Sequence, residues 1–255
     1  SHIVAVSGYN LTIIVGALMV VVRRKSLIGL WLAIGAIGFY VVMTGFAASI
    51  LRAAVMSIVL LVTSYSRRKA DLWAVFAVSV WVMTAWSPDY LLTDISWQLS
   101  VLALAGVLVV APRVVALEKS HMTSWKRVVL DILLVSLAAH LVTAPLIAYY
   151  FGTVSLIAPL ANVVILPVIP VLMLGGILAA TLGVAHPGMA FIIMWPLRFC
   201  IDIVTQIVSW FARVPYAELS VGEVGIVGII LAYLLLGGLA WLTQQKTRKI
   251  RSKTV

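Results

Sequence analysis

The charged side chains of Arg52, Arg198 and Asp202 lie well inside long apolar stretches of this chain, where a charge is costly. An arginine at the centre of a membrane-spanning helix costs about 2.5–3.5 kcal/mol on insertion scales, so it usually faces water or a partner. Arg198 and Asp202 stand one helical turn apart, and we predict an intramembrane ion pair between them. Arg52 has no acidic neighbour in its own stretch, which indicates that it faces water or another segment and could attract an anion.

Neutral polar side chains recur in the apolar stretches as well. In a membrane such groups either join helices by hydrogen bonds or line a wet path. Asp94 and Gln98 share one face of a predicted helix, for which Thr93 is a candidate N-cap. His140 alone is more typical of interhelical hydrogen bonding than of catalysis. The candidate positions along a wet path are Ser7, Gly8, Asn10, Thr12, Ser49, Arg52, Asp94, Gln98, Ser100, His140, Thr143 and Asn162.

A serine–histidine pair is the catalytic arrangement that we considered. Ser7, followed by Gly8, and His140 occur in the chain order of a rhomboid-type intramembrane serine protease. Ala5 replaces the glycine expected two residues before the serine, and no oxyanion-hole loop is identifiable. Cys200 is the lone cysteine and the four histidines are scattered, which excludes a cysteine or histidine metal cluster. We predict no enzyme, no catalytic residue, no metal and no cofactor, and we keep the protease as a less favoured alternative.

The elements that must position these side chains are membrane helices. The 255 residues are 64% hydrophobic and 10% charged, whereas a soluble domain is about half apolar and a quarter charged. The mean hydropathy is +1.17. Apolar stretches near the ~20 residues that cross a bilayer predict an all-α polytopic membrane protein with about nine spans. These stretches are 3–22, 27–44, 46–64, 71–86, 95–111, 128–147, 153–184, 189–212 and 224–242.

The distribution of basic residues predicts the topology. Lys and Arg gather in every second connection, at 23–25, 67–69 and 113–127, and in the tail at 246–253. The formal net charge of +10 is therefore mainly a topology signal, because cytoplasmic loops carry the excess of Lys and Arg. We predict a multi-pass protein of the cytoplasmic (inner) membrane, with its N-terminus outside and its C-terminus in the cytoplasm.

Small residues and helix breakers shape the predicted spans. A ridge on which another helix can pack closely recurs at every fourth position, at Gly45, Ser49, Ala53 and Ser57. Stretch 153–184 is long for one span and rich in proline and glycine, so we predict a broken or re-entrant helix there. Irregular backbone at membrane depth requires burial in protein or a wet cavity, which indicates an aqueous path. The predicted helix-break or structural positions are Pro145, Gly152, Pro159, Pro167 and Pro170.

Four motifs, taken in order, resemble the competence domain of the ComEC family. These are HIVAVSGYNLTII at 2–14, GFAASILRAAVMSIVLL at 45–61, DISWQLSVLALAG at 94–106, and HLVTAPLIAYYFGTVSLIAPLANVVILPVIP at 140–170. They cover about the first two thirds of the chain, and the remainder is compatible with the family. Members often carry histidine where Asn10 stands, although both side chains donate and accept hydrogen bonds.

The resemblance implies an inner-membrane channel through which naturally transformable bacteria take up single-stranded DNA. The whole of 1–255 would be the channel domain, its polar positions would line the DNA path, and Arg52 would attract phosphates. The implied partners are single-stranded DNA, the lipid bilayer and other competence proteins, namely an external DNA receptor and a cytoplasmic motor or single-strand-binding proteins.

Two further expectations concern domains and alternatives. The sequence holds neither the oligonucleotide-fold domain nor the metallo-β-lactamase-like domain of many members, and its start without Met suggests an excised piece. The other open alternative is a secondary transporter for a small anion, with its midplane site at 153–184.

Overall fold

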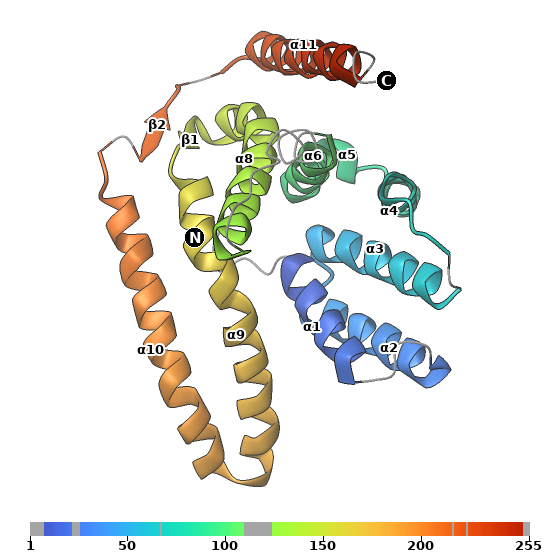
Figure 1. Ribbon diagram of the computed structural model, residues 1–255, viewed down its shortest axis with the longest axis vertical. Helices are drawn as coiled ribbons and strands as arrows, with labels where there is room; N and C mark the ends of the chain where they lie inside the picture. Colours follow the sequence, from blue (N-terminus) through green and yellow to red (C-terminus); the bar gives the residue numbers. More distant parts are fainter. Residues whose placement is uncertain are drawn as a thin grey trace. The chain divides into compact units, whose positions relative to one another are not determined.

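The computed structural model describes residues 8–21, 26–66, 68–109, 124–215, 217–222 and 224–251, and Figure 1 labels their elements. It is 84% helical, which confirms the predicted all-α class apart from two short strands. The helices are α1 (Gly8–Val21), α2 (Leu27–Met43), α3 (Ala48–Tyr65), α4 (Leu72–Trp86), α5 (Tyr90–Thr93), α6 (Ile95–Val109), α8 (Ser124–Phe151), α9 (Ala158–Ala185), α10 (Pro187–Ala212) and α11 (Ile226–Arg251). The strands are β1 (Thr153–Ser155) and β2 (Glu218–Ser220).

Four helices are long and apolar enough to cross a membrane: α3, α8, α9 and α10. Shorter apolar helices of 10–17 residues are Gly8–Met19, α2, α4, α6 and Ile226–Gly238. Large hydrophobic side chains on these helices point outward; Trp31 is 67% exposed and Phe191 is 72% exposed. An apolar exterior on apolar helices is the surface that lipid requires. The chain is a multi-pass helical membrane protein, and the count of nine crossings stays a prediction.

The chain divides into two compact units. The first comprises Ser1–Ser100 and Val164–Ile207, and the second comprises Val101–Val163 and Val208–Val255.

In the first unit, α1, α2 and α3 pack around one apolar core. Leu11, Ile37 and Ile50 are essentially inaccessible and lie at its centre. Close approach of α1 to α3 depends on Gly8, because a methyl group added there would lie 2.7 Å from Cβ of Ala53. Two members of the predicted small-residue ridge therefore serve this contact, since the carbonyl oxygen of Ser49 also lies beside Gly8.

Also in the first unit, the later part of α9 and the first part of α10 form an antiparallel hairpin (Figure 1). A methyl group added at Gly175 would lie 2.7 Å from a methyl carbon of Leu197. Near the turn, one added at Gly183 would lie 2.8 Å from Cβ of Ala190. The two glycines thus allow the helices to approach closely.

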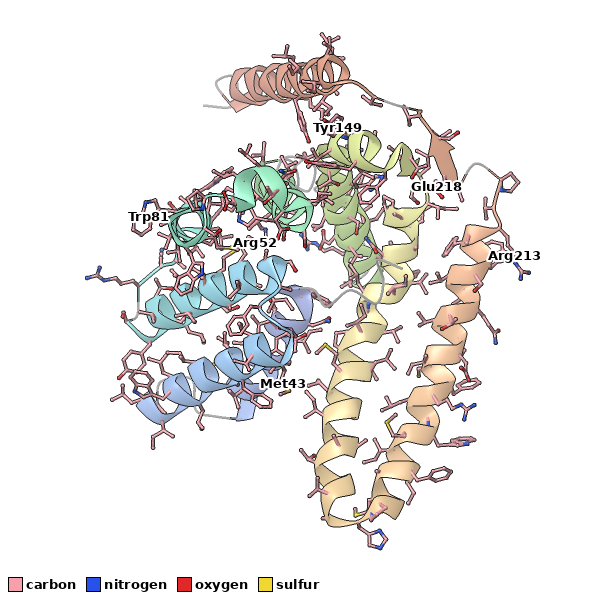
Figure 2. All side chains as sticks on the ribbon, turned by 180° about the vertical axis from the view of Figure 1, so that it is seen from behind. Met43, Arg52, Trp81, Tyr149, Arg213 and Glu218 are labelled. Carbon is pink, nitrogen blue, oxygen red and sulfur yellow. The ribbon has the colours of Figure 1, made fainter. Side chains whose placement is uncertain are left out.

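In the second unit, α8 is the central helix. The hydroxyl of Tyr233 on α11 donates to the carbonyl of Val142 on α8, at 3.1 Å. After α8 the chain turns through Gly152, whose φ of +67° favours glycine, into β1. Strands β1 and β2 pair antiparallel, with Val154 opposite Leu219. Figure 2 shows Glu218 on β2 and Arg213 just after α10.

The prediction of a broken or re-entrant helix at 153–184 was wrong. Helix α9 runs without interruption from Ala158 to Ala185 with Pro167 and Pro170 inside it, and α8 likewise contains Pro145. A proline removes one backbone donor, and a membrane helix continues when a neighbouring side chain satisfies the freed carbonyl. For α9 such a neighbour exists, because Tyr9 donates a hydrogen bond to a carbonyl of this helix.

The other two helix-break positions act at helix ends. Pro159 is the second residue of α9, where a missing amide hydrogen costs nothing because the first turn has no intrahelical acceptor. Gly152 follows the last residue of α8 and donates its amide to the carbonyl of Ala148, at 2.9 Å. These two residues do mark a boundary between helices.

Candidate functional site

Arg52 lies in the apolar helix α3 (Figure 2) and reaches across to α6. One of its terminal nitrogens, Nη1, donates to the carbonyl oxygen of Ser100. Its Nε is buried and has no hydrogen-bond partner in the described part of the chain. Arg52 thus contacts another segment, as its lack of acidic neighbours predicts, and keeps one buried donor without an acceptor.

A second buried donor without an acceptor lies on the same helix as Ser100. Trp97 is 5% exposed, and its indole Nε1 has no partner among the residues described. Trp97 and Ser100 are three residues apart, so they share a side of α6. Buried polar atoms nearly always have a partner, so these two donors mark Arg52 and Trp97 as a candidate site. Sequence reasoning missed Trp97, because an apolar helix gives no sign of which indole is buried.

The start of α6 differs from the prediction in its cap. Asp94, not Thr93, is the N-cap: its Oδ1 accepts from the amide of Trp97 at 2.9 Å. The hydroxyl of Thr93 instead donates within α5 to the carbonyl of Asp89, at 2.7 Å. Gln98 donates through Nε2 to the carbonyl of Leu91, at 2.8 Å. Asp94 and Gln98 therefore hold the connection between α5 and α6.

The polar residues of α1 are engaged within the first unit. Asn10 forms a side-chain hydrogen bond with Tyr40 of α2. The hydroxyl of Thr12 donates to the carbonyl of Gly8 at 3.1 Å, one turn earlier in the same helix. Gly8 itself provides the close approach to α3 described above. Ser7, the first of the predicted path residues, lies outside the described residues.

The second unit brings the predicted residues His140, Thr143 and Asn162 together around Ser136, which was not predicted. Ser136, His140 and Thr143 are spaced by four and three residues and form one face of α8. From α9, the amide nitrogen of Asn162 donates to the hydroxyl of Ser136 at 3.0 Å. His140 hydrogen-bonds the backbone of Ser155 in β1, while its Nε2 is buried without a partner among the described residues.

The remaining members of this polar face are buried and bonded within the protein. Ser136 is 8% exposed and Thr143 is 7% exposed, and the Thr143 hydroxyl donates to the carbonyl of Ala139 at 3.0 Å. Sequence reasoning missed Ser136. Its spacing of four residues before His140 was the available signal.

The predicted ion pair is not formed in the structure. Arg198 and Asp202 are both exposed on α10, and no ion pair joins them in the part of the chain that is described. Their spacing of one turn still permits it. The pair therefore stays a prediction.

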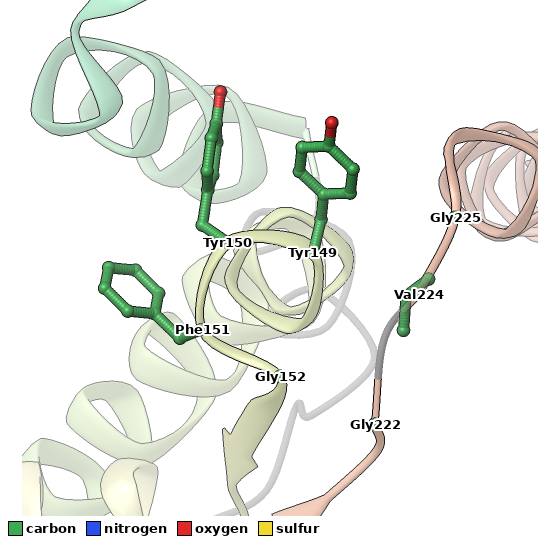
Figure 3. A pocket seen from close by; sticks show the side chains of 7 residues that line it. All are labelled: Tyr149, Tyr150, Phe151, Gly152, Gly222, Val224 and Gly225. Carbon is green, nitrogen blue, oxygen red and sulfur yellow. The ribbon is translucent and has the colours of Figure 1, made fainter.

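A cavity of about 870 Å³ lies in the second unit (Figure 3). Its aromatic wall consists of Tyr149, Tyr150 and Phe151 at the end of α8. Gly152, next to Phe151, also lines it, and Gly222, Val224 and Gly225 line it from the segment after β2 (Figure 3). Of the residues predicted from the sequence, Gly152, a predicted helix-break position, lines this cavity. Among the described residues, no group of three His, Cys, Asp or Glu side chains could hold a metal ion.

The fold and these contacts define a multi-pass helical membrane protein whose spans carry an arginine and several joined polar side chains. The chain belongs to the family described as Competence protein, whose model matches residues 1–246. This match confirms the resemblance found in the motifs and extends it through nearly the whole chain. Comparison with the curated proteins gave no match, and comparison with the solved structures gave none. Membership gives the protein a role in competence, the uptake of DNA.

Proposed function

We propose that this protein is the transmembrane channel through which single-stranded DNA crosses the cytoplasmic membrane during natural transformation. A DNA strand carries one negative charge per nucleotide and cannot enter hydrocarbon, so it needs a path with polar walls. The observation that carries the proposal is the guanidinium of Arg52. It lies in an apolar span, and its buried Nε has no acceptor among the described residues. A phosphate oxygen is an acceptor of the right charge and geometry for it.

The scarcity of charge in the spans supports transport rather than storage of the strand. A groove of many arginines would bind phosphates tightly and release them slowly, whereas conduction needs sites weak enough to leave. The polar face of α8 offers neutral groups instead, including Nε2 of His140, which has no partner in the part of the chain that is described. In this proposal Arg52 attracts the strand and the neutral residues pass it on.

The topology and partners belong to the same proposal. The alternation of basic connections supports an external N-terminus and a cytoplasmic C-terminus. The sequence contains no phosphate-binding loop of the form G-x-x-x-x-G-K-[ST], so a cytoplasmic motor, a single-strand-binding protein or a gradient would drive the strand. An external receptor would deliver it. The channel would need no catalytic residue and no cofactor.

The alternatives gain no support from the structure. The anion transporter depended on a discontinuous helix at the membrane midplane, and α9 is continuous. The protease would need Ser7 beside His140. The described contact of His140 is with the backbone of Ser155.

The test is import of labelled single-stranded DNA by cells whose only copy of the gene carries an Arg52 variant. Arg52→Gln keeps a donor for the Ser100 carbonyl and removes the charge, and we expect at least a tenfold loss of import. Arg52→Lys keeps the charge and should retain a measurable part. Arg213→Gln, at an exposed position just after α10, is the matched control, because it removes the same charge outside the predicted spans. Normal import by Arg52→Gln protein at wild-type membrane abundance would refute the role of Arg52.

A further inference from the structure

The cavity at the end of α8 has an unusual pair of walls. Tyr149, Tyr150 and Phe151 are consecutive, and they are 39%, 36% and 47% exposed. The rings of Tyr149 and Tyr150 meet edge to face, with centroids 5.0 Å apart and an interplanar angle of 71° (Figure 3). Core aromatic residues are buried, so three partly exposed rings around one cavity form a surface that faces a ligand or the membrane interface.

The rest of the described lining is mostly glycine. Gly152 and Gly222 both have positive φ, at +67° and +72°, so side chains are disfavoured at both positions. The amide of Val221 donates to the carbonyl of Gly152 at 2.9 Å, next to the paired strands β1 and β2. Two segments distant in sequence are thus fixed side by side, and apart from the rings the described lining consists of three glycines and Val224.

The helix end beside the cavity favours a neutral ring over an anion. No charged side chain lines it among the described residues. The C-terminal end of α8, where the helix dipole is negative and the last carbonyls lack intrahelical donors, adjoins the aromatic wall. This end repels a phosphate, but it accepts hydrogen bonds from N–H groups. A flat, uncharged ring that carries an N–H group is the ligand that suits this lining.

We propose that this aromatic cavity binds the nucleobases of single-stranded DNA by stacking, with the phosphates left in the solvent. This proposal rests on the proposed function, because it names the part of the strand that this site would recognise. Stacking on aromatic side chains tolerates any base, since every base has a π face. The volume of about 870 Å³ lies within the range for ligand pockets, so the site can hold a nucleobase with its sugar.

The experiment measures binding of two dye-labelled strands of equal length to the full chain in lipid nanodiscs, by fluorescence anisotropy. One strand is oligo(dT), and the other is an abasic strand with the same sugar and phosphates. The wild-type protein should bind oligo(dT) more tightly. Tyr149→Ala and Tyr150→Ala should weaken oligo(dT) binding about tenfold and leave abasic binding unchanged, because stacking contributes about 1–3 kcal/mol per base by alanine substitution.

Three controls separate the outcomes. Tyr150→Phe keeps the ring and should retain binding, which also shows that an Ala effect is not misfolding. Trp195→Ala removes an exposed aromatic side chain on α10 and should change neither strand. Arg52→Gln should weaken both strands alike.

Equal binding of both strands, with no effect of the Tyr→Ala variants, overturns the stacking site and leaves the channel standing. Binding of neither strand by the wild-type protein instead overturns the proposed function. Loss of oligo(dT) binding on addition of choline, with abasic binding retained, would assign the cavity to a cationic head group and also overturn the stacking site.

Discussion

The hydroxyl of Tyr9 on α1 donates a hydrogen bond to the carbonyl oxygen of Leu166 on α9, at 3.3 Å. This carbonyl stands four residues before Pro170, which has no amide hydrogen to offer it. A side chain far away in the sequence therefore supplies the donor that proline removes. The contact explains how α9 stays continuous, and it fixes α1 to α9 within the first unit.

We predict that Tyr9→Phe lowers the free energy of unfolding by about 0.5–1.5 kcal/mol, the usual contribution of one hydrogen bond. Pro170→Ala restores a helical donor for Leu166, so the same Tyr9→Phe change should cost much less in that background. Thermal unfolding in detergent of the wild type, both single variants and the double variant measures the difference. An equal cost in both backgrounds would show that Tyr9 does not compensate for the proline.

The contact of α1 with α3 gives a prediction about volume. Gly8→Ala places a methyl carbon 2.7 Å from Cβ of Ala53, so we expect a destabilisation of about 1–3 kcal/mol from overpacking. Ala53→Gly should relieve most of it. Gly16→Ala on the same helix is the control, because no atom lies within 4 Å of the added methyl group and alanine is the better helix former. Melting temperatures decide the case, and a loss at Gly16 equal to that at Gly8 would contradict the packing argument.

The helices themselves could be predicted from the sequence, because a long run of apolar residues is stable in few structures other than a membrane helix. Stretches 46–64 and 71–86 correspond to Ala48–Tyr65 and Leu72–Trp86 within two residues. The effect of the prolines could not be predicted. Whether a proline breaks a membrane helix depends on a donor from elsewhere, and the pairing of Tyr9 with Leu166 leaves no local pattern.

The candidate site, like the fold, could be predicted only in part from the sequence. Polar types at membrane depth identified Arg52, His140 and Asn162 as special positions, but not their partners Ser100, Ser155 and Ser136. The aromatic cavity was missed. Its two walls meet through a pair of three-residue strands, which are too short to give an alternating pattern.

The hydrogen bond between Asn162 and Ser136 joins α9 to α8, and we predict a modest coupling energy for it. Interhelical hydrogen bonds in membranes contribute about 0.6 kcal/mol on average and up to about 1.7. The four proteins of a double-mutant cycle with Asn162→Ala and Ser136→Ala, unfolded in the same detergent, give this energy. A coupling of zero would show that each side chain has other partners in the membrane.

The charges of α10 give a prediction about the insertion of this helix into the membrane. Arg198 and Asp202 are exposed on an apolar helix, so neutralising one leaves the other without a counter-charge. We expect Arg198→Leu or Asp202→Leu alone to reduce membrane insertion by up to about 2.5–3.5 kcal/mol, and the double variant to restore it. The inserted fraction, measured by glycosylation or cysteine labelling, tests this. Single variants that insert as well as the double variant would mean that both charges reach the head groups independently.

The number of phosphates that the protein contacts can be read from the salt dependence of DNA binding. For a single strand, the logarithm of the binding constant falls with the logarithm of salt concentration by about 0.7 per phosphate neutralised. If Arg52 pairs with one phosphate, Arg52→Gln should make this slope shallower by about 0.7, whereas Arg213→Gln, outside the spans, should leave it unchanged. The slopes are measured with oligo(dT) in nanodiscs over a range of salt concentrations. A slope that Arg52→Gln does not alter, together with weaker binding, would mean that Arg52 acts by holding α3 to α6 through Ser100 and makes no phosphate contact.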